Sequence, residues 1–227
     1  MAEGGPPRGG GRPGAMTRTG GKATRRRLLL EAIRLFGASG YENTSLEAVA
    51  TAAGVRKQTL LYYFPTKDAL LDACVAETST RVAEELAAAL DAESSTEKKA
   101  ETVVRTLFRL AGEWPEFPQF VRQASRLDPD VIARFAANLE PLRLRALAFL
   151  AQGMNAGQIR RQDPALLLFT LYTSVVGSIT EAGVLRAVVG EDESRTALRT
   201  REREVLDFVR NALAPPTAGR ARTATSA

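Results

Sequence analysis

Apolar residues recur at helical spacing along most of this 227-residue chain. Near the N-terminus, Leu29, Ile33 and Phe36 fall at positions i, i+4 and i+7. Gly40 then supplies a stop. The same spacing returns in residues 97–113, and no stretch of the sequence alternates apolar and polar residues as a half-buried strand would. The pattern therefore predicts an all-α protein.

Two short helices are expected after the first one. The pattern places one at about residues 45–52 and the next at about 56–63. Gly54 lies between them and can take the positive φ that a sharp turn demands. Two short helices joined by a tight turn that contains glycine have the form of a helix-turn-helix unit, which here covers about residues 45–64.

Polar residues and one proline mark the ends of these helices. Thr44 followed three residues later by Glu47 has the form of a capping box for the second helix. Pro65 ends the third helix, because a proline cannot continue the helical hydrogen bonding. Thr66 is the expected N-cap of a long fourth helix.

The third helix divides into an apolar side and a chemically mixed side. Leu60 is expected to point into a small core together with Val55 and Phe64. Three side-chain types on this side can contact bases: lysine donates to guanine, glutamine pairs with adenine, and an apolar side chain packs against a thymine methyl. Arginine, threonine and tyrosine form hydrogen bonds with phosphates. The remaining residues offer all of these groups: Arg56, Lys57, Gln58, Thr59, Leu61, Tyr62 and Tyr63.

The charge of the chain is unevenly distributed. The formal net charge is +5 and the isoelectric point is about 9.7. Residues 18–67 hold nine Lys or Arg against three acidic residues, so this segment alone carries +6. A solvated basic face would explain such a run equally well by itself, but it coincides here with the helix-turn-helix pattern.

Enzymatic chemistry finds little support in the sequence. Histidine, the commonest general base and metal ligand, is absent, and no phosphate-binding glycine loop or cluster of metal ligands occurs. Cys74 is the only cysteine, and its spacing from Leu70 and Leu71 favours a buried apolar role over a reactive one. We therefore expect no enzyme, no metal and no cofactor.

The two ends of the chain have the composition of disordered tails. Residues 1–20 and 214–227 are rich in Gly, Pro, Ala, Ser, Thr and Arg, which cannot bury enough apolar surface to offset the entropy of ordering. The N-terminal segment lacks the continuous apolar core of a secretory signal. A single cysteine gives no reason to invoke an oxidising compartment, so a cytoplasmic protein is expected.

The most apolar stretch of the chain, residues 163–189, admits three interpretations. A membrane span is disfavoured because polar residues such as Thr173 and Glu181 interrupt a run that is already short. A fully buried core helix is possible. A helix covered partly by its own domain and partly by a second copy explains the apolarity best, and with the helix at about 194–213 it predicts a homodimer through about residues 163–213.

A pocket for a small molecule is only loosely indicated. Aromatic residues in the middle helices supply apolar surface that either lines a cavity or simply fills the core. No ligand contact can be assigned among them: Trp114, Phe117, Phe120, Phe135, Phe149, Phe169 and Tyr172.

Residues 22–82 resemble the tetracycline-repressor-like (TetR/AcrR) family of transcriptional regulators in register and without a gap. Many matches at fixed spacing make the resemblance specific. It is carried by Ile33, Leu35-Phe36, Gly40-Tyr41, Thr44-Ser45, Val49-Ala50, Ala53-Gly54-Val55, Lys57, Thr59-Leu60, Tyr62-Tyr63-Phe64, Lys67 and Ala69-Leu70-Leu71.

The resemblance implies which residues meet DNA. The third helix would enter the major groove with Lys57, Gln58 and Leu61 toward the bases. Phosphates would be held by Thr44, Thr59, Tyr62, Tyr63 and Lys67, with Arg56 as a further contact, unless one tyrosine packs against the fourth helix instead. Two residues depart from the family: Leu61 stands where tyrosine is usual, and Gln58 stands where a small residue is common. Glu47 is at a position where some members contact a base, but we interpret it as a helix cap.

The resemblance also implies an architecture and a mode of action. A three-helix DNA-binding domain, residues 21–67, would be joined by the long fourth helix to a helical ligand-binding and dimerisation domain, residues 68–213, with about nine helices in all. Such a protein would bind a palindromic operator on double-stranded DNA as a dimer, most often repress, and be released by a small hydrophobic effector. The alternative is a nonspecific architectural DNA-binding protein, which would share the basic patch.

Overall fold

The computed structural model describes residues 18–93, 95–127, 129–190 and 194–215, and within these ranges it contains ten α-helices and no strand. The all-α prediction is confirmed. There is one helix more than the nine expected, because the apolar run at 163–189 is divided at Glu181 into two helices. The helices are α1 Arg18–Ser39, α2 Leu46–Ala52, α3 Lys57–Tyr63, α4 Lys67–Ala92, α5 Thr96–Glu113, α6 Glu116–Leu127, α7 Pro129–Asn155, α8 Pro164–Thr180, α9 Ala182–Val189 and α10 Arg195–Leu213.

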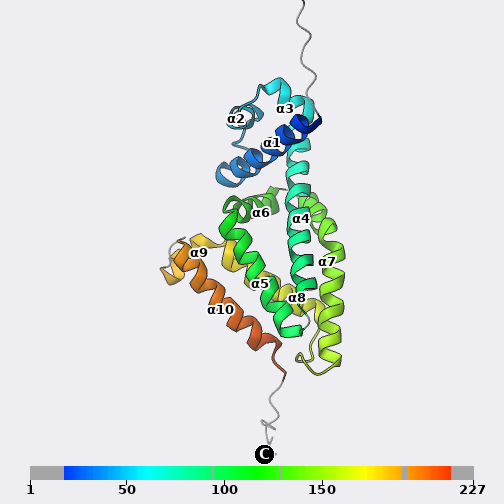
Figure 1. Ribbon diagram of the computed structural model, residues 1–227. Helices are drawn as coiled ribbons and strands as arrows, with labels where there is room; N and C mark the ends of the chain where they lie inside the picture. The colour runs from blue at the N-terminus through cyan, green and yellow to red at the C-terminus, as the bar shows by residue number, and fades with distance from the viewer. Residues whose placement is uncertain (1–17, 94, 128, 191–193, 216–227) are drawn as a thin grey trace, which may run out of the picture.

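Helices α1, α2 and α3 gather at one end of the molecule around the start of α4 (Figure 1). Gly54 joins α2 to α3 with φ +65°, a conformation that a residue with a Cβ rarely adopts. Leu28, Ile33 and Leu60 are fully buried in one cluster beneath these helices. The helix-turn-helix pattern and its small core are therefore present as the sequence predicted.

The ends of the chain correct one predicted boundary. Helix α1 begins at Arg18, so residues 18–20 belong to a helix and not to the N-terminal tail. The rest of that tail lies outside the described residues. At the other end, Ala214 is the C-cap of α10, and the part of the predicted tail after Pro215 also lies outside them.

The capping box predicted for α2 is wrong. Ser45 is the N-cap, and its hydroxyl accepts a hydrogen bond of 3.0 Å from the backbone N–H of Ala48. Thr44 is buried, 3% exposed, and its hydroxyl donates to the carbonyl of Gly40 at 2.8 Å. The carboxylate of Glu47 pairs with Lys57. Thr66, in contrast, caps α4 as predicted and accepts from the N–H of Ala69 at 3.0 Å.

The body of the molecule is built from α4 to α10. Helix α4 descends from the three N-terminal helices and packs against α5 and α7, and α10 packs on α5 from the outside (Figure 1). Helix α7 continues through Pro141, from residue 129 to 155. Within the described residues no helix is both long and apolar enough to cross a membrane.

The N-terminal helices are joined to the body by a close contact between α1 and α6. Gly37 is buried where the two helices meet, and a Cβ placed on it would lie 3.0 Å from the carbonyl oxygen of Glu116 and 3.2 Å from the backbone nitrogen of Phe120. Only glycine allows the two backbones to approach this closely.

Candidate nucleic-acid interface

The burial of one side of α3 fixes which side chains face outward. Leu60 is completely buried and Phe64, the C-cap, is nearly so, while Val55 packs against the same cluster. Because successive residues of an α-helix are about 100° apart, anchoring this side turns positions 57, 58 and 61 toward solvent. Lys57 and Gln58 are exposed there, and Leu61 is 37% exposed.

Residues predicted to hold phosphates surround this face. Arg56 is exposed at the N-cap of α3, and Thr59 is partly exposed. Tyr62 is 78% exposed, whereas Tyr63 packs against the core and makes an edge-to-face contact with Tyr62 at 5.1 Å between ring centroids. Of the two tyrosines, Tyr63 is therefore the one that packs. Its hydroxyl lies beside Gly21 of α1.

Lys67 is held in place at the first turn of α4. Its Nζ lies 4.2 Å from the ring centroid of Tyr41 and donates to the carbonyl of Glu42 at 3.3 Å. The Tyr41 hydroxyl in turn donates to the carboxylate of Asp68. Burial, together with this hydrogen bond, raises the pKa of Tyr41 well above its ordinary value, so the phenol stays protonated and tied to α4. Sequence reasoning did not identify this tie.

Thr44 does not share the exposure of the other predicted phosphate contacts. Its hydroxyl lies in the interior beside the carbonyls of Gly40 and Leu35, at 2.8 and 3.3 Å. Because the Thr44 hydroxyl donates its proton to backbone carbonyls near the end of α1, it cannot donate that proton to a phosphate. Thr44 is therefore not part of the candidate interface.

Two features of this face were missed by the sequence reasoning. The first is the ion pair of 3.4 Å between Lys57 Nζ and Glu47 Oε2, which crosses from α3 to α2. The second is a set of exposed cations on α1, of which Arg25 lies 5.3 Å over the ring of Phe64, the C-cap of α3. The net charge of residues 18–67 signalled these cations, but it did not indicate that Arg25 lies beside α3.

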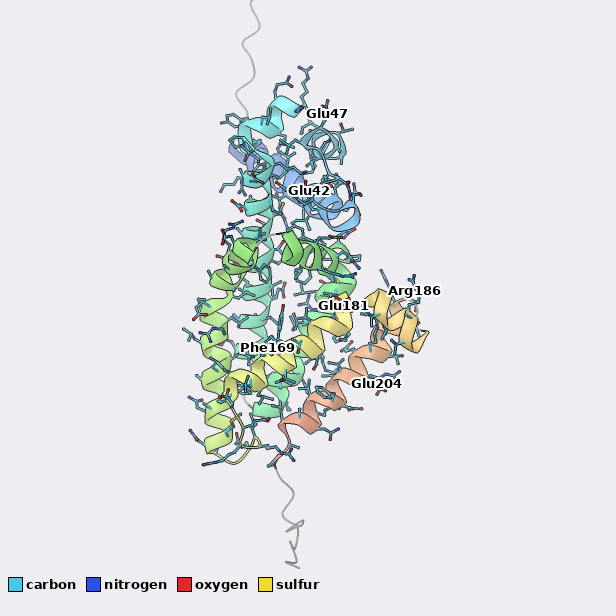
Figure 2. The ribbon with its side chains drawn as sticks, turned by 180° about the vertical axis from the view of Figure 1, so that it is seen from behind. Glu42, Glu47, Phe169, Glu181, Arg186 and Glu204 are labelled. Atoms are coloured by element: carbon cyan, nitrogen blue, oxygen red, sulfur yellow. The ribbon has the colours of Figure 1, made fainter. Side chains whose placement is uncertain are left out.

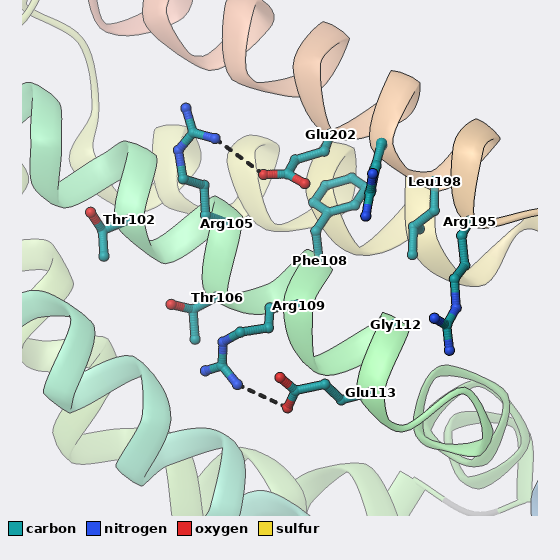
Figure 3. Close-up of a pocket in the computed structure, with 11 residues that line it drawn as sticks. Thr102, Arg105, Thr106, Phe108, Arg109, Gly112, Glu113, Arg195, Leu198 and Glu202 are labelled. Atoms are coloured by element: carbon teal, nitrogen blue, oxygen red, sulfur yellow. Dashed lines mark hydrogen bonds and ion pairs between the residues drawn. The ribbon is translucent and has the colours of Figure 1, made fainter.

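A groove of about 590 Å³ lies between α5 and α10. Its walls are charged: Arg105 faces Glu202 at 3.3 Å and Arg109 faces Glu113 at 3.0 Å, while Arg195 reaches toward α5 (Figure 3). Pockets for hydrophobic molecules are lined mainly by apolar and aromatic side chains, so this groove does not match the expected effector. No group of three or more potential metal-ligating side chains occurs among the described residues.

The aromatic residues of the middle helices fall into two sets. Trp114 and Phe120 are buried, and Phe117, Phe135 and Phe149 are partly buried against the core clusters. On α8, in contrast, Phe169 is 63% exposed and Tyr172 is 52% exposed. The first set fills the core, and the second set forms part of an outer surface.

Comparisons with known proteins agree with this geometry. Residues 28–74 match the model of the family described as bacterial regulatory proteins, tetR family. The chain is 26% identical to the HTH-type transcriptional regulator RutR of Escherichia coli (strain K12) over 169 residues, which cover 74% of this chain and 79% of that protein.

Solved structures share the whole architecture. The fold is similar to that of the transcriptional regulator FadR from Bacillus subtilis in complex with stearoyl-CoA, with a TM-score of 0.70 and 15% identity over 83% of this chain and 98% of that chain. It is also similar to the ketosteroid transcriptional regulator KstR2 of Mycobacterium tuberculosis, with a TM-score of 0.68 and 16% identity over 84% and 94% of the two chains.

A helix-turn-helix unit presented at one end of an all-helical body defines a DNA-binding transcriptional regulator. Residues 28–74 carry the tetR-family pattern of bacterial regulatory proteins, which confirms the family resemblance of this part of the chain.

Proposed function

We propose that this protein is a sequence-specific regulator that places α3 in the major groove of a palindromic operator and most simply acts as a repressor. The observation that carries the proposal is the outward face of α3. Lys57, Gln58 and Leu61 are exposed on one side of a helix whose opposite side is locked into the core by Leu60. A rigid helix that offers a cation, an amide and an apolar group matches the chemistry of base edges.

Phosphate contacts would position this helix on the duplex. We assign them to Arg56, Thr59, Tyr62 and Lys67, and leave out Tyr63 because it packs against the core. The exposed cations of α1 support the assignment, since they extend the positive surface beyond α3. On this proposal residues 21–67 form the DNA-binding domain and residues 68–213 form the regulatory domain.

A homodimer would follow from the outer surface of α8 and α10. Leu166, Phe169 and Tyr172 recur every three residues along α8 and are each at least half exposed, and Phe208 of α10 is also exposed. Figure 2 shows Phe169 on the body, at a distance from Glu47 at the DNA-binding end. Exposed large apolar side chains of this kind are typical of an interface. A second copy bound here would supply the second recognition helix that a palindrome requires.

An effector would act through the body. FadR from Bacillus subtilis was solved with stearoyl-CoA, and KstR2 is a ketosteroid regulator. By analogy we propose a small hydrophobic effector whose binding changes the separation of the two recognition helices and so weakens operator binding. Its site is not assigned to the charged groove between α5 and α10.

Selection from a random pool of duplexes tests the central proposal. The full chain should enrich a palindrome whose half-sites are about 10 base pairs apart. At physiological salt, the selected duplex should bind at least about 1,000-fold more tightly than random duplex. Equal affinity for selected and random duplexes would instead indicate an architectural protein that recognises only the phosphate backbone.

Single substitutions separate base contacts from phosphate contacts. Lys57→Ala and Gln58→Ala should relax discrimination at one base pair each. Lys67→Ala should weaken all duplexes alike and reduce the slope of log affinity against log salt by about one unit. Lys98→Ala, on the exposed surface of α5, is the matched control and should change neither quantity. If the three alanine variants at residues 57, 58 and 67 lose the same affinity for every duplex, positions 57 and 58 do not contact bases.

A further inference from the structure

The groove between α5 and α10 has no part in the function proposed above. It lies on the body of the molecule, apart from α1, α2 and α3 (Figure 1). Four arginines and two glutamates line it, so its wall carries a net charge of +2. The charged lining residues are Arg105, Arg109, Arg195, Arg199, Glu113 and Glu202.

The two arginines of α5 are already balanced by carboxylates. Arg105 lies 3.3 Å from Glu202 of α10, and Arg109 lies 2.8 Å from Glu85 of α4. Both arginines also have a second acidic partner on α5 itself. The excess positive charge of the groove therefore belongs to the two arginines of α10.

Arg195 and Arg199 differ from the arginines of α5 because neither has an ion pair or a side-chain hydrogen bond within the described part of the chain. Both are exposed, and they are four residues apart on one helix, where like charges repel. Arg195 is also the first residue of α10, and the N-terminal end of a helix favours negative charge. The stability of α10 thus gives no account of these two cations.

The size and the remaining lining of the groove suit a small molecule. Its volume of about 590 Å³ falls within the range of about 300–1,000 Å³ that is usual for such sites. Phe108 and Leu198 contribute apolar surface, and Gly112 leaves space because it has no side chain. Figure 3 shows Arg195 and Leu198 extending from α10 toward Gly112 of α5. Cationic and apolar groups therefore meet in one groove.

We infer that the groove between α5 and α10 binds a small organic anion that carries two negative charges on a compact apolar group. A guanidinium presents its N–H donors as a fork that matches a carboxylate or a phosphate. Arg195 and Arg199 donate to the anion, and Phe108 and Leu198 contact its apolar part. Phosphate monoesters and dicarboxylates share this chemistry. The site is separate from that of the proposed hydrophobic effector and does not depend on DNA binding.

Calorimetric titration of the full chain at pH 8 and physiological salt tests the inference. The probes are phenyl phosphate and phthalate, with benzyl alcohol as a neutral compound of similar size. At least one of the two anions should bind, and benzyl alcohol should not. Replacing both arginines, Arg195→Gln with Arg199→Gln, should weaken the binding by about 10-fold or more, because hydrogen bonds to charged groups are lost.

The matched control, Arg160→Gln with Arg161→Gln, removes the same charge from two exposed arginines outside the groove. The backbone N–H of Arg160 donates to the carbonyl of Leu213 at 3.2 Å, so this control alters the opposite end of α10 from Arg195. It should leave the affinity for the anion unchanged. Thermal melting without ligand checks that both double variants are folded.

The outcomes of the titration separate the two kinds of ligand and the failure of the inference. Binding of phenyl phosphate alone assigns the site to phosphate monoesters, and binding of phthalate alone assigns it to dicarboxylates. The inference is overturned if neither anion binds, as expected if the acidic residues 191–193 neutralise the two arginines instead. It is also overturned if both double variants lose the same affinity, because the attraction would then depend only on net charge.

Discussion

Replacing Gly37 with alanine should force α1 away from α6. The new Cβ would lie 3.0 Å from the carbonyl oxygen of Glu116, 3.2 Å from the nitrogen of Phe120 and 3.5 Å from Cβ of Gln119. The first two neighbours are backbone atoms of α6, and they cannot rotate aside as a side chain would. The helices must therefore separate by several tenths of an ångström.

The expected cost follows from two opposing contributions. Alanine in a helix is more favourable than glycine by up to about 1 kcal/mol. Overpacking a tight contact costs typically about 1–3 kcal/mol. Gly112→Ala offers a matched control near the C-terminal end of α5, because its Cβ would meet only Cδ2 of Leu198 at an ordinary 3.5 Å. Both variants gain the helical contribution, so the difference between them isolates the steric cost of about 1–3 kcal/mol.

Calorimetric melting of the two variants and the wild type, at equal protein concentration, measures this difference. For a chain of this size each kcal/mol shifts the Tm by about 2–4 °C, so Gly37→Ala should melt roughly 2–12 °C below Gly112→Ala. If the two variants have the same Tm, α1 and α6 accommodate the added Cβ without loss of stability, and the predicted steric cost is refuted.

Three further predictions concern single side chains. The buried Cys74 thiol, whose pKa is raised by burial, should not react with a thiol reagent at pH 8 until the protein is unfolded; reaction in the native state would contradict its burial. The hydrogen bond from Arg210 lowers the pKa of Glu101 below its ordinary 4.5. The stabilisation of the fold by this bond is therefore fully present above pH 4.5 and is lost as the pH falls through the pKa that Glu101 has in the folded protein. In urea unfolding, Glu101→Gln should therefore be less stable than wild type at neutral pH, with a gap that narrows on acidification; a constant gap would exclude this linkage. Phe169→Glu should weaken dimerisation in sedimentation by about 30-fold or more, whereas Leu144→Glu on α7 should not; a monomeric wild-type protein at micromolar concentration would refute the dimer.

The DNA-binding helices could be predicted because their signals are local. Gly54 has the positive φ that its turn requires, Thr66 caps α4, and Leu60 is buried where the helical spacing placed it. Each of these features depends on neighbours within a few residues. The candidate face of α3 could therefore be chosen from the sequence once the opposite face was identified.

Other features depended on contacts between distant segments. Thr44 and Ser45 are adjacent hydroxyl residues that can both cap a helix, and only the packing of Thr44 under the end of α1 decides for Ser45. Phe169 and Phe120 have the same side chain, yet one is exposed on α8 and the other buried under α1. The pairing of Glu47 with Lys57 arises from the angle between α2 and α3, which spacing along the chain does not reveal.

The length of α4 sets the mechanical sensitivity of the molecule. Its 26 residues extend for about 39 Å at 1.5 Å per residue, from the Tyr41 and Asp68 contact at one end to the base of the body at the other. A tilt of only about 5° at the base would displace the far end by roughly 3.4 Å, the axial rise of one nucleotide along a DNA strand. Leverage of this kind lets a rearrangement smaller than a side chain move α3 out of register with its half-site by a full base pair.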